Sequence, residues 1–175
     1  MKIRHLFAAL AVAPLAVSTA LPAAADSTSA ATVTVTGGTL ALTAPANAGS
    51  LGSRANSVAG GVISGPLGEV VVSDARSAIA GSAWVASVIS TAFTPLAGPA
   101  IPASNVSYTA GAIAKVGTAT YTANNPTNLT GVVPAVTASG ITGDNSATWT
   151  PSINVTVPGG MAATTYAATI THSVA

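Results

Sequence analysis

The sequence predicts an all-β domain, an antiparallel β-sandwich with Greek-key or jelly-roll-like connections, with a barrel as the alternative. Short stretches of alternating apolar and polar residues recur along the chain, and this is the side-chain period of a strand. Clusters of Gly, Pro and Asn separate these stretches, and none of them has the apolar stripe of a helix. Apolar residues make up 49% of the chain, which is too many for a disordered protein.

Residues 1–25 have the three parts of a secretory signal peptide. Lys2 and Arg4 give a basic start, an uncharged apolar run follows, and small Ala residues precede Asp26. We expect cleavage between Ala25 and Asp26, which leaves a secreted protein without a transmembrane anchor. A retained anchor is the less favoured alternative, because a membrane span needs about 20 predominantly apolar residues and Pro, Ser and Thr interrupt this run.

Residues 26–175 are predicted to form a single domain that works outside the membrane. Its first strand signals are residues 32–36, 39–43, 67–73, 82–90, 101–108 and 118–122. Because residues 67–73 and 82–90 carry apolar side chains on both faces, we expect them to be central strands. Gly37-Gly38 is predicted to close a first hairpin, and residues 124–128 and 139–145 are predicted to be loops.

The clearest alternation lies at residues 147–157, where Thr, Ser and Asn occupy every even position. The odd positions carry Ala, Trp, Pro, Ile and Val, so Trp149, Ile153 and Val155 should face the core. Pro151 has no N–H to donate, which indicates a strand edge or a bulge at this point.

A second alternating stretch covers residues 166–174 and places Tyr166, Ile170 and His172 on one face. Pro158-Gly159-Gly160 separates it from the preceding strand and is a natural turn sequence. The two stretches therefore predict a long terminal hairpin or a strand-loop-strand unit.

Charged residues are scarce outside the predicted signal peptide. Residues 26–175 contain three basic and four acidic residues, which gives a net charge of −1. These residues are Arg54, Arg76 and Lys115, and Asp26, Glu69, Asp74 and Asp144. Without a basic patch the chain is not expected to bind nucleic acid. It contains no cysteine, hence no disulfide, and no spacing of residues predicts a zinc site, a calcium loop or any other cofactor.

No pattern of residues predicts a catalytic centre, and we interpret the protein as non-enzymatic. His172 is the only histidine outside the predicted signal peptide, and its place on an alternating strand favours packing over a catalytic triad. The few carboxylates do not suggest the facing pair that glycoside hydrolysis needs. The sequence Asp74-Ala75-Arg76 is predicted to be a turn in which Asp74 accepts backbone N–H groups and Arg76 is its partner.

Trp84 and Trp149 have the largest side chains of the predicted domain, and each lies in a strong strand signal. Exposed tryptophans often stack on sugar rings, whereas buried ones anchor a core. The core interpretation is favoured because Trp149 shares its strand face with Ile153 and Val155.

Several short motifs together resemble those of the WxL-domain surface proteins of Gram-positive bacteria. In chain order they are Gly38-Thr39-Leu40-Ala41-Leu42, Val70-Val71-Val72-Ser73-Asp74-Ala75-Arg76, Ala83-Trp84-Val85-Ala86-Ser87-Val88, Ile101-Pro102-Ala103, Trp149, Val155-Thr156-Val157-Pro158 and the stretch from Tyr166 to His172. Trp84-Val85-Ala86 and Trp149-Thr150-Pro151 stand where the family has Trp-x-Leu, so we describe the chain as WxL-like, an actinobacterial-type variant by its high Ala and Gly content.

The resemblance implies non-covalent attachment to cell wall peptidoglycan, alongside other secreted surface proteins. It singles out Trp84, Trp149, Asp74 and Arg76 as family-motif positions, in the core or at a ligand. No LPxTG-like sorting signal is visible near Ala175, which agrees with non-covalent retention. We expect a secreted, non-enzymatic protein associated with wall glycan or with partner surface proteins. The alternatives are a self-associating structural or adhesive subunit and, less favoured, a secreted hydrolase.

Overall fold

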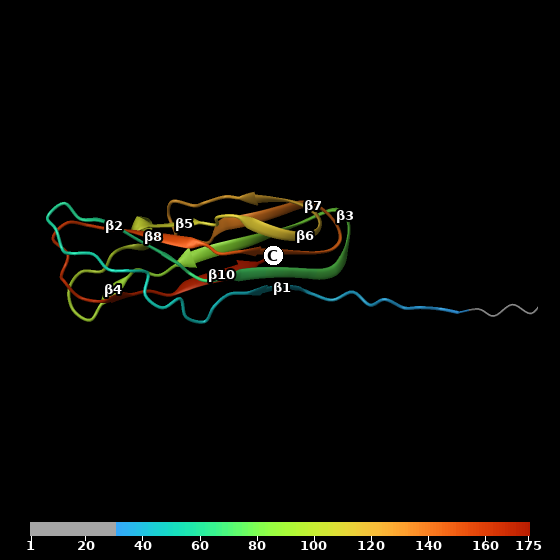
Figure 1. Cartoon of the computed structure of the whole chain (residues 1–175), viewed down its shortest axis with the longest axis horizontal. Coiled ribbons are helices and arrows are strands. Elements are labelled where there is room, and N and C mark those ends of the chain that lie inside the picture. Colours follow the sequence, from blue (N-terminus) through green and yellow to red (C-terminus); the bar gives the residue numbers. More distant parts are fainter. Residues whose placement is uncertain (1–30) are drawn as a thin grey trace, which may run out of the picture. The chain divides into compact units, whose positions relative to one another are not determined.

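The computed structural model describes residues 31–175, which form antiparallel β-sheets and one short 3-10 helix (Figure 1). The sheets are open at their edges and pack as a β-sandwich, which confirms the predicted fold class and excludes the barrel. The predicted signal peptide, residues 1–25, and its cleavage site at Ala25 and Asp26 lie outside the described residues.

The strands belong to three sheets. The five-stranded sheet has the order β1-β3-β7-β6, with β10 also paired to β3; its strands are β1 (Leu40–Thr43), β3 (Val70–Ser90), β7 (Val133–Trp149), β6 (Ile113–Ala123) and β10 (Ile170–Val174). The three-stranded sheet consists of β2 (Gly61–Pro66), β8 (Ser152–Val157) and β5 (Val106–Thr109), which follows the 3-10 helix Ala103–Asn105. The smallest sheet pairs β4 (Thr94–Pro95) with β9 (Tyr166–Ala167).

Strands β3, β7 and β6 form a ribbon that folds back on itself (Figure 1). Asp74 pairs with Asn145 in the first half of β3, and Trp84 pairs with Ala138 in the second half. The indole Nε1 of Trp84 nevertheless donates a hydrogen bond to Oδ1 of Asn145 at 3.0 Å. The two halves of the ribbon therefore face each other as two layers, and β1 flanks the first half while β10 flanks the second.

The fold of the ribbon occurs where both long strands lose their regular register, between Asp74 and Trp84 in β3. On β7 this region includes Gly140 and Gly143, whose φ angles of 62° and 71° are favoured only by glycine. Such irregularities bend a strand sharply without ending its pairing. The predicted loop at residues 139–145 is therefore wrong, because these residues form the bend within β7.

The two predicted central strands, residues 67–73 and 82–90, are largely the two halves of the single strand β3. Their central position is confirmed, since β3 pairs with β1, β10 and β7. Asp74-Ala75-Arg76 lies within this strand and is not a turn. The local bonds predicted for it do form, as the next section describes.

At the C-terminal end of β7 the chain passes from one sheet to another through Thr150 and Pro151. Pro151 lies at this break, and its carbonyl oxygen accepts a hydrogen bond of 2.9 Å from the N–H of Leu67. The alternation predicted for residues 147–157 continues across the break, and Trp149, Ile153 and Val155 are buried as expected.

The predicted terminal hairpin is wrong, although its strands exist. Strand β8 belongs to the three-stranded sheet, whereas β10 pairs with β3 of the five-stranded sheet. The turn at Gly159 and Gly160 thus opens a longer crossover between sheets. The alternation at residues 166–174 is confirmed, since Tyr166, Ile170 and His172 are half-buried and their neighbours are exposed.

The remaining strand predictions have mixed outcomes. Residues 39–43 and 118–122 lie in β1 and β6, apart from Thr39, while residues 101–108 divide into a bridge, the 3-10 helix and the start of β5. Residues 32–36 form no strand, and Gly37-Gly38 closes no hairpin. The N–H of Gly38 instead bonds to the carbonyl oxygen of Ala75, beyond which β3 turns away and offers no straight edge.

The core is one continuous cluster of aliphatic and aromatic side chains from both larger sheets. Its largest fully buried members include Trp84, Trp149, Tyr108, Ile141 and Leu129. Within residues 31–175, no helix has the length and apolar character needed to span a membrane.

Candidate functional site

Trp84 and Trp149 are both core residues, with 1% and 2% of their surface exposed. Neither ring is therefore available to stack on a sugar, and the core interpretation of both is confirmed. Each indole N–H has a polar partner inside the core, and these partners define two separate clusters.

The first cluster contains Trp84, Asp74 and Arg76, three of the four positions that the resemblance singles out. Asn145 joins Trp84 to Asp74. Asn145 Oδ1 accepts hydrogen bonds from Trp84 Nε1 at 3.0 Å and from the Tyr121 hydroxyl at 3.1 Å. Its Nδ2 donates to Oδ2 of Asp74 at 3.2 Å. Arg76 completes the cluster by binding Asp74 with both Nε, at 2.8 Å, and Nη2, at 2.9 Å.

Asp74 is buried, yet its pKa is held below its ordinary value. The hydrogen bond from the Arg76 side chain is the main cause, and burial alone would act in the opposite direction. The backbone N–H of Arg76 also donates to Oδ1 at 3.2 Å, as the sequence predicted. Both carboxylate oxygens of Asp74 thus accept hydrogen bonds from Arg76 or Asn145. The cluster therefore stabilises the structure at the point where the ribbon folds.

The second cluster consists of Trp149, Tyr108 and His172 and connects β7, β5 and β10. Trp149 Nε1 can only donate, and it does so to the Tyr108 hydroxyl at 2.7 Å. The hydroxyl hydrogen then remains for Nε2 of His172, 3.3 Å away. A neutral imidazole whose Nε2 accepts from the hydroxyl fits this arrangement, and the direction of the bond follows the tautomer of His172.

Burial favours the neutral forms of both His172 and Tyr108. It lowers the pKa of His172 below its ordinary value and raises that of Tyr108 to about 12. The imidazole ring meets the phenol ring edge-on, with 5.7 Å between centroids. In residues 31–175, the side-chain hydrogen bond that the structure gives His172 is thus to a tyrosine hydroxyl.

Among residues 31–175, the carboxylates of Glu69 and Asp144 make no hydrogen bond to either cluster. Glu69 and Asp144 are exposed, and Oδ1 of Asp144 accepts the N–H of Ser77 at 2.8 Å at the fold of the ribbon. In the part of the chain that the structure describes, no group of three or more His, Asp or Glu side chains is placed to hold a metal ion.

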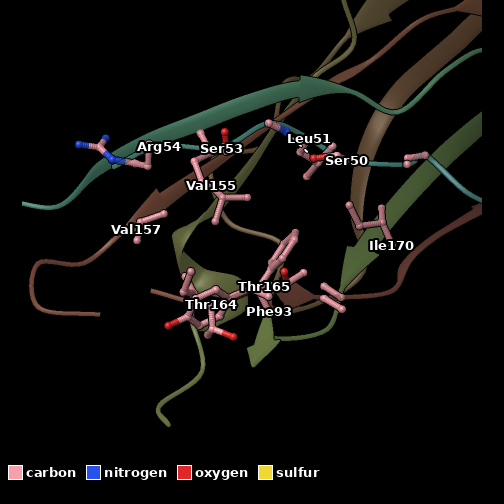
Figure 2. A pocket seen from close by; sticks show the side chains of 18 of the residues that line it. Ser50, Leu51, Ser53, Arg54, Phe93, Val155, Val157, Thr164, Thr165 and Ile170 are labelled. Atoms are coloured by element: carbon pink, nitrogen blue, oxygen red, sulfur yellow. Dashed lines mark hydrogen bonds between the residues drawn. The ribbon is translucent and has the colours of Figure 1, made fainter. Parts of the chain in front are cut away.

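A groove of about 810 Å³ adjoins the second cluster, because His172 is one of its lining residues (Figure 2). Its floor is aliphatic and aromatic and comes from β2, β8, β10 and the segment around Phe93; the floor residues are Ile63, Leu67, Phe93, Ile101, Val155, Val157, Met161 and Ile170. Cavities of this size accommodate small ligands or short segments of a polymer.

Two segments form the walls of this groove, residues 44–57 on one side and residues 161–169, which include the short strand β9, on the other. The first segment holds itself in shape by short-range bonds, among them Gly49 N–H to Asn47 Oδ1 at 2.7 Å. The second is tied at its end to Thr91, whose N–H and hydroxyl both bond to the backbone of Thr169. Ser, Thr and Asn side chains line the rim (Figure 2).

The first wall approaches the sheet closely at Gly65 of β2. A Cβ at this position would overlap the carbonyl oxygen of Leu51 and lie 2.6 Å from its Cα. Only glycine therefore lets the wall pass over the strand, and this contact sets one side of the groove.

The groove is almost free of charge. Arg54 is its one permanently charged lining residue, and its Nη2 donates to the carbonyl oxygen of Gly60 at 2.7 Å. In Figure 2 the guanidinium is directed away from Val155 and Phe93. His172, which also lines the groove, is neutral at ordinary pH because burial lowers its pKa. The groove thus fits a ligand without strong charge.

The sequence did not predict this groove. The alternation predicts that Val155 and Val157 face inward. It does not show that the segments packed over them leave a groove. The first wall is a long stretch without strand alternation, and the Gly, Ser and Asn residues at positions 47–57 indicate such a segment.

Comparison of the chain with protein-family models, characterised proteins and solved structures finds no significant match.

Proposed function

We propose that this protein is a secreted, non-enzymatic, WxL-like surface protein that binds cell wall peptidoglycan non-covalently through the groove. The observation that carries the proposal is the chemistry of the groove, an apolar floor within a rim of hydroxyl and amide groups and almost no charge. Peptidoglycan combines sugar hydroxyls and acetamido groups with short peptides, so it offers both hydrogen-bonding groups and methyl groups to such a surface. The predicted signal peptide supports a location where this polymer is met.

A partner surface protein is the second candidate ligand. Sugar sites commonly use exposed aromatic rings for stacking, and here both tryptophans are buried. An extended peptide instead needs hydrogen-bonding walls and apolar pockets, which the segments 44–57 and 161–169 and the aliphatic floor supply. This observation favours a polypeptide ligand, either of a partner or of the peptide part of the wall.

Sedimentation of the purified protein with insoluble peptidoglycan tests the proposal. We expect saturable binding that Thr165→Glu reduces about tenfold or more, because a carboxylate at a rim that excludes water loses hydration on binding. Thr171→Glu is the matched control, since Thr171 is equally exposed but does not line the groove. Binding that is equally weakened by both variants would place the contact elsewhere.

The same variants distinguish the two ligands. If the protein stays in the supernatant with peptidoglycan at every pH and salt concentration, wall binding is wrong. Photo-crosslinking from a probe at position 165 on living cells would then identify a polypeptide partner, with a probe at 171 as control. A chain that neither sediments with the wall nor crosslinks from position 165 would leave the groove without a binding role.

A further inference from the structure

We infer that copies of this protein associate by strand addition, in which residues 32–36 of one copy pair with the outer edge of β6 in a second copy. The inference is independent of the groove and goes beyond the proposed wall binding. It follows from two features of the same chain, an unpaired edge strand and a strand-like segment that no sheet takes up.

The acceptor is the outer edge of β6, the last strand in the order β1-β3-β7-β6. In residues 31–175, the backbone hydrogen bonds of β6 are made to β7 alone. Natural proteins blunt such edges with charges, prolines or bulges. In β6 the Lys115 side chain and the irregularity between Val116 and Thr118 protect the first half. A second irregularity lies between Thr118 and Thr120. Residues 120–123 contain no charge, no proline and no further irregularity, so this part of the edge is open to a further strand.

The donor is the sequence Thr32-Val33-Thr34-Val35-Thr36. β-branched residues in strict alternation are the strongest strand formers, and this segment contains nothing else. Nevertheless it forms no strand, and Val33 and Val35 are 91% and 85% exposed. Residues 32–36 thus have the composition of a strand but no partner strand, and their valines remain exposed.

The side-chain patterns of donor and acceptor match. In β6, Ala119, Tyr121 and Ala123 point inward and are half-buried, while Thr118, Thr120 and Thr122 are exposed. A donor strand in register places Val33 and Val35 beside the inward row and its threonines beside the outward row. Valine beside tyrosine and threonine beside threonine are among the favourable cross-strand pairs of antiparallel sheets.

The donor cannot reach the β6 edge of its own chain. Gly38 is bonded to Ala75 of β3, so it lies at the β1 side of the sheet. A strand beyond β6 would lie four strand spacings away, roughly 19 Å. Thr36 can be at most about 7 Å from Gly38, because the two residues are only two positions apart in the chain. The acceptor edge must therefore belong to another molecule, and the match between the two sequences makes a second copy of this chain the partner.

Disulfide trapping tests this pairing, and the natural chain contains no cysteine to interfere. Thr34→Cys and Thr120→Cys are purified separately from a Gram-positive host, in the form that the host accumulates, then mixed under mild oxidation. Thr118→Cys and Thr122→Cys cover the neighbouring registers. We expect a Thr34–β6 disulfide-linked peptide by mass spectrometry in at least one mixture, and none in the mixture of Thr34→Cys with the exposed control Thr171→Cys.

Sedimentation velocity over a concentration series gives the second readout. We expect the unmodified chain to self-associate and the double substitution Val33→Lys, Val35→Lys to weaken association more than tenfold. Both valines are exposed, so this variant should keep its circular dichroism spectrum and unfolding midpoint. The inference is overturned by a concentration-independent monomer, by association that the lysines leave unchanged, or by equal trapping at position 171.

Discussion

At the scale of single residues, hydrogen bonding of buried polar side chains is complete in the part of the chain that the structure describes. In residues 31–175, no buried side-chain nitrogen or oxygen lacks a hydrogen-bond partner. Asn145 contributes most to this result, because its amide joins Trp84, Tyr121 and Asp74, which come from both halves of the folded ribbon. Such a network rigidifies a core when every member is satisfied.

Asn145→Ala should therefore destabilise the domain. The substitution leaves the indole N–H of Trp84 without an acceptor in the core, and an unsatisfied buried donor costs about 1–3 kcal/mol. Urea unfolding followed by tryptophan fluorescence measures the change. Asn124→Ala is the control, since it removes only an exposed bond to Thr137 and should cost within about 0.5 kcal/mol. Equal losses in both variants would show that the network has no special role.

His172 should make stability depend on pH in a defined window. Burial lowers its folded pKa below the ordinary value of 6.5, so the unfolded chain takes up a proton first as the pH falls. The free energy of unfolding should then decrease below about pH 6.5, by at most ~1.4 kcal/mol per pH unit, and level off below the folded pKa.

The control for this titration is His172→Gln, whose amide oxygen can still accept from Tyr108 but does not titrate. Its unfolding free energy should be flat through the same window. Asp74 does not interfere, because its pKa is lowered from the ordinary value of 3.8 and its stabilisation is lost only as the pH falls through that more acidic range. A wild-type curve as flat as that of the variant would contradict the neutral, accepting imidazole.

Burial and local contacts of single residues were largely predictable from the sequence, because both depend on residues that are close together in the chain. The burial of Trp149, Ile153 and Val155 followed from a period of two, and the contact of Asp74 with Arg76 from their proximity in the chain. The partners Asn145 and Tyr108 were not predictable. They are separated from Trp84 and Trp149 by 61 and 41 residues, and only the tertiary fold brings them together.

At the scale of elements, the folded ribbon explains most of the wrong predictions. Gly140 and Gly143 in β7 indicate loops by composition, yet the strand continues through them with a bend. The same bend turns β3 away from Gly38, which leaves residues 32–36 without a neighbouring edge. Strand existence was therefore predictable, whereas strand pairing and continuity were decided by contacts far apart in sequence.

Gly65→Ala tests how an element shapes the groove. The added methyl group overlaps the Leu51 carbonyl, so the wall at residues 44–57 must move outward. Overpacking of this kind typically costs about 1–3 kcal/mol, and we expect weaker peptidoglycan binding by the folded variant. Gly131→Ala is the matched control, because its Cβ meets nothing within 4 Å. Unchanged binding by Gly65→Ala would show that this wall does not contact the ligand.

At the scale of the whole molecule, the folded faces of the domain are the candidates for contact with a surface. Outside the predicted signal peptide it has few charges, so long-range electrostatic attraction to an anionic surface is weak. Short-range contacts through the groove and strand addition at β6 are compatible with each other, because they use different strands.

Export is the condition on which this surface role depends, and it makes a direct prediction. In a Gram-positive host the protein should accumulate outside the membrane with Asp26 as its first residue, shown by intact mass and N-terminal sequencing. Ala25→Leu should block processing, because the peptidase accepts only small side chains before its cut, while Asp26→Ala should be processed normally. An unprocessed protein beginning at Met1, recovered from the cytoplasm, would remove the basis for a role at the cell wall. Strand addition would survive that result, because it requires only the folded domain and residues 32–36.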